Sequence, residues 1–316
     1  MKGIEIKTKE SAMTATADKP RRRSRRIAAA AMLAILAFAS SAAAHAAPPV
    51  KYCRFEAAGR TSYGIVEGDR VRALSAAPFG PFEKTDTTYP LSAVKLLAPT
   101  APKKVLALAF NYRSHFAMGG TPLKDGEELP ARFKYPQPFF KGASCIIGPG
   151  DEIVIPADSR QTDYEGEMVI VIGKRAKSVP KDKALDFVLG VTCGNDVSER
   201  YWQNDEKNQD VQWWRSKSSD TFGPVGPFIA SGLDYDKLRI QLRVNGTVKQ
   251  DVNTSVMIHD VRTIVSFISR YVTLEPGDLI FTGTTGTTEP IKAGDVVEVE
   301  IEGIGTLRNP VVREKS

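Results

Sequence analysis

The sequence predicts an α+β fold with a mainly β core. Short segments with the period-two pattern of strands recur from residue 50 to the C-terminus, separated by turns that contain Gly, Pro or Asn-Gly. Few segments have a helical period. The chain has no GxGxxG motif and no P-loop, so a doubly wound sheet is not expected. Its 316 residues are enough to bury a large core in one or two domains.

The first 46 residues predict a cleaved signal peptide. Basic residues at Arg21–Arg26 precede an apolar run at Ile27–Ala39, and small residues with an Ala-His-Ala triplet at 44–46 follow it. The apolar run is too short to predict a membrane span. We therefore expect export to the periplasm or the medium, through the Sec route or, from the Arg pair before Ile27, the twin-arginine route.

Removing this leader changes the charge balance. The whole chain has 43 Lys and Arg against 37 Asp and Glu, and residues 1–46 carry nine of the basic and three of the acidic ones. The mature protein would thus have 34 of each, which gives no argument for a nucleic acid partner or for stable membrane association. The three cysteines, Cys53, Cys145 and Cys193, have neither the number of a disulfide framework nor the spacing of a zinc site.

Two domains are predicted after the leader. In the first, residues 47–100, three strands over 50–74 form a β-meander, and a short helix follows within 90–104, where prolines also indicate the domain boundary. The second domain, residues 101–316, begins with a buried strand at 104–110. About thirty irregular residues follow, and so long a segment is typical of a functional lid.

Further elements are predicted along the second domain. They comprise a strand at 162–174, a hairpin with an Asn-Gly turn at 245–246, a helix at about 258–271, and strands at 277–284 and 295–303.

The strand predicted over Thr162–Lys174 carries an unusual pair of acids. Glu165 and Glu167 lie on the same face as Val169 and Val171, and the later half of the strand is apolar on both faces, as in a strand buried on both sides. Two carboxylates about 7 Å apart in a partly dry setting repel each other and raise each other's pKa. A metal ion between them would relieve this repulsion, and a strand end that reaches solvent would do so equally well.

Other polar residues are weaker candidates on their own. Asp196, Arg200 and Gln203 would lie along one face of a helix, although Asp196 would equally suit a helix N-cap with a surface ion pair to Arg200. Lys217 lies in a polar loop, where most lysines are solvated. Thr284 lies in the turn "FTGTTGTT", which can present hydroxyl and N–H groups to an anion or can be a simple turn.

The order of these segments resembles the fumarylacetoacetate hydrolase family. The resemblance covers about residues 101–316 and implies stacked mixed β-sheets with a β-roll, often a homodimer, and a divalent cation in a cleft; the β-meander is similar to the small N-terminal domain of many members. The segments that carry it are "NYRSH", "PFFKGASCIIGPGDEIVIP", "DYEGEMVIVIGK", "GVTCGNDVSERYWQ", "KSSDTFGPVGP", "LEPGDLIFTGT" and "GDVVEVEIEGIGTLRNPV".

The resemblance also implies roles for eight residues. The metal ligands would be Glu165, Glu167 and Asp196, a carboxylate set that suits Mg²⁺ first and Mn²⁺ or Ca²⁺ as alternatives. The substrate acid would be held by Arg200, Gln203 and Thr284. The catalytic residues would be Lys217, which stabilises an enolate on the metal, and His115, which activates water.

These roles imply a hydrolase that cleaves a carbon–carbon bond in a β-diketo or acylpyruvate-like (fumarylacetoacetate-type) acid through that enolate. The same cage also suits an isomerase, decarboxylase or lyase acting on 2-oxo or 2-hydroxy-dienoic acids, similar to 5-carboxymethyl-2-hydroxymuconate isomerase. An exported metal-containing binding protein without turnover is the third alternative.

The lid departs from the family pattern. Its histidine is normally followed three residues later by a glutamate, but Met118 has that position after His115. Either one of the acids Asp125, Glu127 and Glu128 replaces the glutamate, or the pair is absent and hydrolysis is in doubt.

Overall fold

The computed structural model describes residues 49–119, 123–124, 126–205, 207 and 209–315. The predicted signal peptide lies outside these residues, so export stays a prediction. Within the described part of the chain, no helix has both the length and the apolar character needed to cross a bilayer.

The N-terminal β-meander is confirmed. Strands β1 (Val50–Ala57), β2 (Arg60–Glu67) and β3 (Arg70–Leu74) pair in order, and β4 (Lys84–Pro90) extends them. The predicted short helix is wrong, because only one 3₁₀ turn, η1 (Leu91–Ala93), precedes strand β5 (Lys95–Leu97), which pairs with β1. Prolines at both ends leave too few residues for a stable helix, while β1 offers hydrogen-bond partners.

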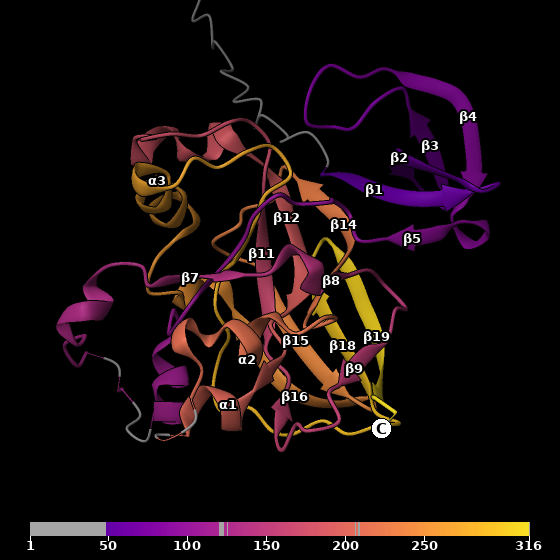
Figure 1. Cartoon of the computed structure of the whole chain (residues 1–316). Coiled ribbons are helices and arrows are strands. Elements are labelled where there is room, and N and C mark those ends of the chain that lie inside the picture. The colour runs from indigo at the N-terminus through magenta and orange to yellow at the C-terminus, as the bar shows by residue number, and fades with distance from the viewer. Residues whose placement is uncertain (1–48, 120–122, 125, 206, 208, 316) are drawn as a thin grey trace, which may run out of the picture. The chain divides into compact units, whose positions relative to one another are not determined.

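A large sheet runs in the order β4-β3-β2-β1-β14-β12-β11-β17-β6-β7, with β5 on β1 and β8 on β14 (Figure 1). Because β1 pairs with both β2 and β14, the two predicted domains share this sheet, and their boundary at residue 100 stays a prediction. The remaining strands of this sheet are β6 (Val105–Leu108), β7 (Pro138–Lys141), β8 (Ile146–Ile147), β11 (Gly166–Ile172), β12 (Val188–Asn195), β14 (Gly223–Ser231) and β17 (Leu279–Phe281).

Two smaller sheets and short helices complete the described fold. The order in the five-stranded sheet is β16 (Thr247–Asn253), β15 (Arg239–Val244), β18 (Val296–Ile301), β19 (Gly305–Arg313) and β9 (Ile153–Ile155), and β10 (Thr162–Asp163) pairs with β13 (Ser198–Glu199). The α-helices are α1 (Arg200–Asn204), α2 (Trp214–Ser218) and α3 (Val261–Tyr271). The other 3₁₀ helices are η2 (Arg113–Gly119), η3 (Ala131–Lys134), η4 (Ala143–Cys145), η5 (Lys181–Phe187), η6 (Val211–Trp213) and η7 (Thr254–Val256).

Strand β11 is the buried strand that the sequence predicts. Its residues are all buried, and alternate side chains enter two different apolar clusters. Met168, Ile170 and Ile172 belong to the larger cluster, whereas Val169 and Val171 pack with residues of β6, β14 and β17. Burial on both faces follows from this apolar pattern and places the start of β11 inside the molecule.

Three other sequence predictions are confirmed. Asn245 and Gly246 both have positive φ and connect β15 to β16, as a two-residue hairpin turn requires. The strand predicted at 295–303 is β18, which buries Val297, Val299 and Ile301 and leaves its glutamates on the wetter face. Helix α3 begins after Asp260, whose carboxylate accepts a hydrogen bond from the Thr263 N–H group at 2.7 Å.

Candidate active site

Three carboxylates meet where β11 begins and β12 ends. The antiparallel register sets Gly166 opposite Asn195, so Glu165, just before β11, lies beside Asp196, just after β12. The Asp196 N–H group also donates to the Glu165 carbonyl at 2.8 Å. Glu167 lies on β11, and one carboxylate oxygen from each acid lies within 4.8 Å of the others. All three acids are at most 3% exposed, so a strand end that reaches solvent does not explain them.

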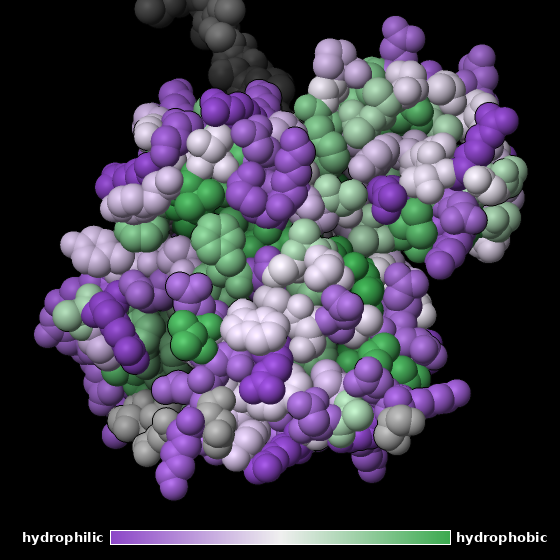
Figure 2. Space-filling model, in the orientation of Figure 1, coloured by the Kyte–Doolittle hydropathy of each residue, from purple (hydrophilic) through white to green (hydrophobic). Residues whose placement is uncertain are grey.

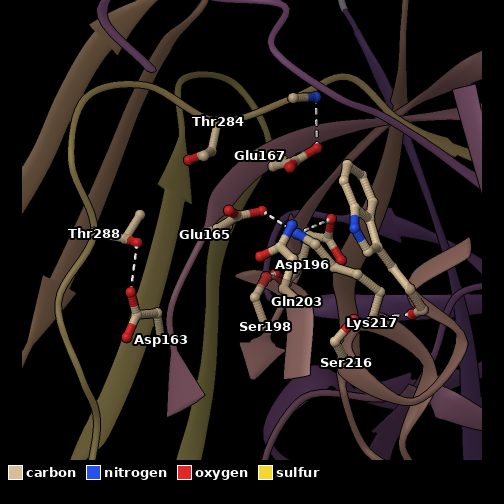
Figure 3. Close-up of polar contacts among 12 residues, drawn as sticks. Asp163, Glu165, Glu167, Asp196, Ser198, Gln203, Ser216, Lys217, Thr284 and Thr288 are labelled. Atoms are coloured by element: carbon tan, nitrogen blue, oxygen red, sulfur yellow. Dashed lines mark hydrogen bonds and ion pairs between the residues drawn. The ribbon is translucent and has the colours of Figure 1, made fainter. Parts of the chain in front are cut away.

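The strand predicted over 162–174 is interrupted at its start. Asp163 pairs with Ser198 in the small ladder of β10 and β13, whereas Gly166 pairs with Asn195 in the large sheet. The chain changes sheets between these two pairings, which leaves Glu165 in the connection and not on the strand. The predicted spacing along one strand face is therefore wrong, although both acids do point into the same site (Figure 3).

Three cations neutralise part of this carboxylate cluster. Lys217 Nζ donates to Glu165 Oε2 at 2.7 Å and to Asp196 Oδ2 at 3.0 Å (Figure 3). Arg200 Nη2 donates to Glu165 Oε1 at 2.6 Å. Lys141 Nζ donates to the other oxygen of Asp196 at 2.7 Å. Buried charges paired in this way form strong hydrogen bonds and cost a great deal when one partner is removed.

Glu165 and Glu167 respond to the cluster in opposite directions. Burial opposes ionisation of Glu165, but the charges of Lys217 and Arg200 more than offset it and hold its pKa well below its ordinary range. For Glu167, burial raises the pKa well above its ordinary value, and the negative charges of Asp196 and Glu165 raise it further. Among the described residues no Lys or Arg forms an ion pair with Glu167, whose Oε2 accepts a hydrogen bond from the Gly283 N–H group at 2.6 Å. The third carboxylate thus needs either a proton or a further cation.

Asp196, Arg200 and Gln203 do not lie along one helix face as predicted, because Asp196 precedes the helix. Helix α1 begins at Arg200, and its N-cap is Glu199, whose carboxylate accepts from the Trp202 N–H group. Asp196 is therefore neither on the helix nor its cap, and the alternative of a surface pair with Arg200 is also wrong. The Arg200 guanidinium is buried and instead binds Asp163, Glu165 and Gln203.

Lys217 and Thr284 are both enclosed. Lys217 lies on α2 and not in a loop, and it is 3% exposed, which excludes the solvated alternative. The Thr284 hydroxyl donates to the Gly166 carbonyl at 3.0 Å and accepts from Gln250 Nε2 at 2.8 Å. In the same turn Gly283 has φ +96°, and its N–H group meets a protein carboxylate, that of Glu167. The group that this turn binds is therefore the Glu167 carboxyl group of the protein itself.

Six of the eight predicted residues line one cavity of about 80 Å³, and the other two, Glu167 and Asp196, join it through their contacts with Glu165. The cavity walls also include apolar side chains, among them Phe110, Phe139 and Trp213. The predicted residues that line it are His115, Glu165, Arg200, Gln203, Lys217 and Thr284.

His115 is held without a carboxylate from the lid. Its Nδ1 atom lies 2.7 Å from the Gly286 carbonyl oxygen, and its Nε2 atom lies 3.6 Å from Glu165 Oε1. Burial lowers the pKa of His115, although the charge of Glu165 opposes this shift. Among the candidate replacement acids, Glu127 accepts from the Lys124 N–H group and Glu128 pairs with Lys134.

Neither Glu127 nor Glu128 therefore supports the histidine, and Asp125 lies outside the described residues. Met118 lines the same cavity as His115.

Sequence reasoning missed one buried cation. Lys141 ends β7, and its fully buried side chain donates to Asp196, to the Lys217 carbonyl and, at 3.2 Å, to the Phe222 carbonyl. All three hydrogens of the ammonium group are used in this way. The only local signal for its role is a lysine at the end of the apolar run "PFFK".

A larger groove lies next to this site. The groove is lined by the exposed side chains of Phe140, Val211 and Trp214. Figure 2 shows that hydrophobic residues reach the surface on the face in view, among hydrophilic ones. Its volume is about 1180 Å³, but none of the eight predicted residues lines it. The candidate site is therefore defined by its chemistry and not by the size of the opening.

The comparisons with known proteins agree with this geometry. Residues 104–312 match the fumarylacetoacetate hydrolase C-terminal family, and residues 50–99 match the Rv2993c-like N-terminal family. The chain belongs to the fumarylacetoacetate hydrolase family. This membership and the sheets described above confirm the predicted fold class.

Three relatives illustrate the range of the family. Protein Rv2993c of Mycobacterium tuberculosis is 47% identical over 247 residues, which are 77% of this chain and 88% of that protein. The 5-carboxymethyl-2-hydroxymuconate delta-isomerase of Mycobacterium smegmatis is 39% identical with a TM-score of 0.75, covering 84% of this chain and 100% of that one. The maleylpyruvate hydrolase of Sphingobium sp. SYK-6, solved with manganese(II) and pyruvate, is 26% identical with a TM-score of 0.67 over the same shares.

Proposed function

We propose that this protein is a metal-dependent hydrolase that cleaves a carbon–carbon bond in a β-diketo or acylpyruvate-like acid. The observation that carries the proposal is the carboxylate triad of Glu165, Glu167 and Asp196, with Lys217 and His115 at the same cavity. Membership of a family whose solved relatives include a hydrolase and an isomerase supports an enzymatic role.

The triad suits a hard divalent cation. Its three carboxylates supply oxygen ligands only, and the raised pKa of Glu167 indicates that positive charge would be favourable there. We propose Mg²⁺ first, with Mn²⁺ or Ca²⁺ as alternatives. Such an ion supplies Lewis acidity, which lowers the energy of an enolate formed from a bound 2-oxo acid.

The surrounding side chains would bind the acid and stabilise charge. Gln203 Oε1 accepts from Arg200 Nη1 at 2.8 Å, which leaves the Gln203 amide hydrogens to donate to a substrate carboxylate. The Lys217 ammonium group would stabilise the negative charge that develops on the leaving enolate. Thr284 and Arg200 would shape the binding cavity, because their polar groups already bind protein partners.

His115 would act as the general base. Its Nε2 atom would take a proton from water, and the resulting hydroxide oxygen would bond to the substrate carbonyl carbon that lies farther from the substrate carboxylate. When the carbon–carbon bond breaks, its electron pair would form the enolate, which would take up the proton held by His115 to give a 2-oxo acid. Atoms and charge balance with water as the only co-reactant.

An isomerase, decarboxylase or lyase is the second candidate. Among the described lid residues, no carboxylate contacts His115, because Glu127 and Glu128 bind other groups. A histidine without such a partner is a weaker base, which favours this candidate, since proton transfer within an enol needs a weaker base than hydrolysis does. The predicted homodimer also stays a proposal.

Product analysis distinguishes these functions. The protein is incubated with Mg²⁺ or Mn²⁺ and a panel of acylpyruvates and other 2-oxo acids, while enol absorbance and free pyruvate are measured in parallel. Hydrolysis requires pyruvate release equal to the loss of enol, whereas loss of enol without pyruvate supports an isomerase. Glu167→Gln should abolish either activity, and Glu298→Gln, a matched change on the wet face of β18, should not. Equal rates in the wild type and Glu167→Gln would contradict a metal-dependent reaction.

A further inference from the structure

Two residues of the lid, Ser114 and His115, bind the backbone of Gly286 in the threonine-rich turn (residues 281–288), and we call this set of contacts the clasp. The Gly286 N–H group donates to Ser114 Oγ at 3.0 Å, and the Gly286 carbonyl oxygen lies 2.7 Å from His115 Nδ1. Ser114 Oγ also lies 2.9 Å from Thr285 Oγ1. Both backbone polar groups of one glycine thus bind two adjacent lid residues, which sets the direction of its carbonyl.

This contact determines which ring nitrogen of His115 carries the hydrogen. A carbonyl oxygen only accepts, so Nδ1 must be the donor in the contact with Gly286. In the neutral imidazole, Nε2 then has the lone pair, and this atom faces the site, 3.6 Å from Glu165 Oε1. The tautomer that the clasp selects is the one that a base acting from Nε2 requires.

Packing fixes the plane of the same ring. The centroid of the Phe110 ring lies 5.6 Å from that of the imidazole, at an interplanar angle of 42°. The same centroid lies 5.1 Å from that of Phe116 and 5.2 Å from that of Phe133. Phe110 has φ +54°, an unfavourable value for a residue with a side chain, and the surrounding contacts maintain it. His115 is therefore restrained on one face and at Nδ1.

We propose that Ser114 is a positioning residue, which holds Gly286 so that a backbone carbonyl keeps His115 in its Nδ1–H form. The clasp supplies the orientation that a carboxylate at Met118 would supply, but it does not supply the charge. This inference rests on the proposed role of His115 as the base, although its spectroscopic test does not require turnover.

The second described histidine provides an internal contrast. His259 Nε2 lies 3.1 Å from the Phe133 carbonyl oxygen, so the same argument gives His259 the opposite, Nε2–H form. The whole chain has three histidines, so the side-chain signals of a ¹⁵N-labelled sample can be assigned by comparison with His45→Gln and His259→Gln variants. Long-range ¹H–¹⁵N spectra at pH 8 with excess Mg²⁺ then report both tautomers.

The expected result is Nδ1–H for His115 and Nε2–H for His259. In Ser114→Ala, the His115 signals should move toward a mixture of tautomers while those of His259 stay unchanged, and kcat should fall about tenfold, the loss of one hydrogen bond, with KM unchanged. Ser114→Thr should restore both. Because Ser114 is exposed, its alanine variant leaves no cavity in the core.

Two outcomes would overturn the inference. One is an Nε2–H signal for His115 in the wild type, a measurement that needs no folded variant. The other is a Ser114→Ala variant with unchanged His115 signals and unchanged kcat. If the signals shift as expected while no acid is turned over, the clasp is supported and the hydrolase proposal fails.

Discussion

Replacing Glu167 by glutamine should stabilise the metal-free protein and remove its response to metal. Glutamine keeps the size of the side chain and an oxygen that accepts from the Gly283 N–H group. Burial raises the pKa of Glu167, and Asp196 and Glu165 raise it further, so its ionisation is unfavourable in the folded state. A neutral side chain avoids this cost, which is the reverse of the loss expected for most substitutions in a core.

The magnitude follows from the spacing of the triad. Two unit charges no more than 4.8 Å apart repel each other by at least about 3.5 kcal/mol at an effective dielectric constant of about 20. Glu167 has two such repulsions, partly offset by Lys217 and by partial protonation, so we expect a net gain of about 1–2 kcal/mol for Glu167→Gln. For a chain of this size that gain raises Tm by roughly 2–4 °C.

Metal binding should stabilise the wild type and leave the variant almost unchanged. A cation at roughly 100 times its Kd stabilises the folded wild type by about 2.7 kcal/mol, or roughly 5 °C in Tm. The variant lacks one of three charged ligands and should show almost none of this shift. The expected pattern is a variant that is more stable than the wild type without metal and less stable with it.

The assay is thermal unfolding with and without Mn²⁺, repeated over pH. Because the pKa of Glu167 is higher in the folded state than its unfolded value of 4.5, the wild type loses stability as pH rises above 4.5. The stability advantage of Glu167→Gln over the wild type should therefore grow as pH rises from that value. Glu298→Gln serves as the control, because that side chain is partly exposed and lies 3.5 Å from Arg308. A Glu167→Gln variant that is less stable without metal and retains the full Mn²⁺ shift would refute the reasoning.

Three further substitutions test the surrounding residues. Lys217→Met should lower turnover by two or more orders of magnitude, which corresponds to about 3–4 kcal/mol of charge stabilisation. It should also lower metal-free stability, since two buried carboxylates each lose one of their two cationic partners. Activity and thermal unfolding measure these effects. Lys141→Met should cost about 3 kcal/mol or more in denaturant unfolding, against little change for the exposed Lys95→Met. Burial lowers the pKa of His115 in the folded state, so below pH 6.5 the unfolded chain binds a proton that the folded chain does not. The stability of the wild type relative to His115→Gln should therefore fall as pH drops below 6.5. A constant difference in stability from pH 7.5 to about 5 would contradict this.

Local pattern was sufficient where neighbours in sequence determine the structure. The apolar faces of β11 predict burial on both sides, and Asn245-Gly246 predicts the hairpin, because side-chain period and turn chemistry act over a few residues. The inward direction of Glu167 also follows from the valines that come after it on β11, whereas Glu165 precedes the strand. Their roles and that of Asp196 came from the resemblance to the family, and the structure brings all three together.

Contacts between distant segments could not be read in this way. Lys141 meets Asp196 across 55 positions of sequence, and His115 meets the Gly286 carbonyl across 171. Neither pair has a periodic signal, since a lysine at a strand end and a glycine in a turn are common features. The break before Gly166 likewise depends on competition between two ladders, which is decided by the partner strands and not by the segment itself.

The charge balance of the site links the metal to the acid that it would bind. Asp163, Glu165, Glu167 and Asp196 give four negative charges when ionised, against three positive charges from Lys141, Lys217 and Arg200. The low pKa of His115 keeps that side chain neutral near pH 7. With Glu167 protonated, as its raised pKa favours, the metal-free site has no net formal charge; a divalent cation that displaces this proton changes the charge to +1, which favours a monoanionic 2-oxo acid. Metal binding would therefore raise the affinity for the acid, and the cluster of buried charges would make that affinity depend on the metal.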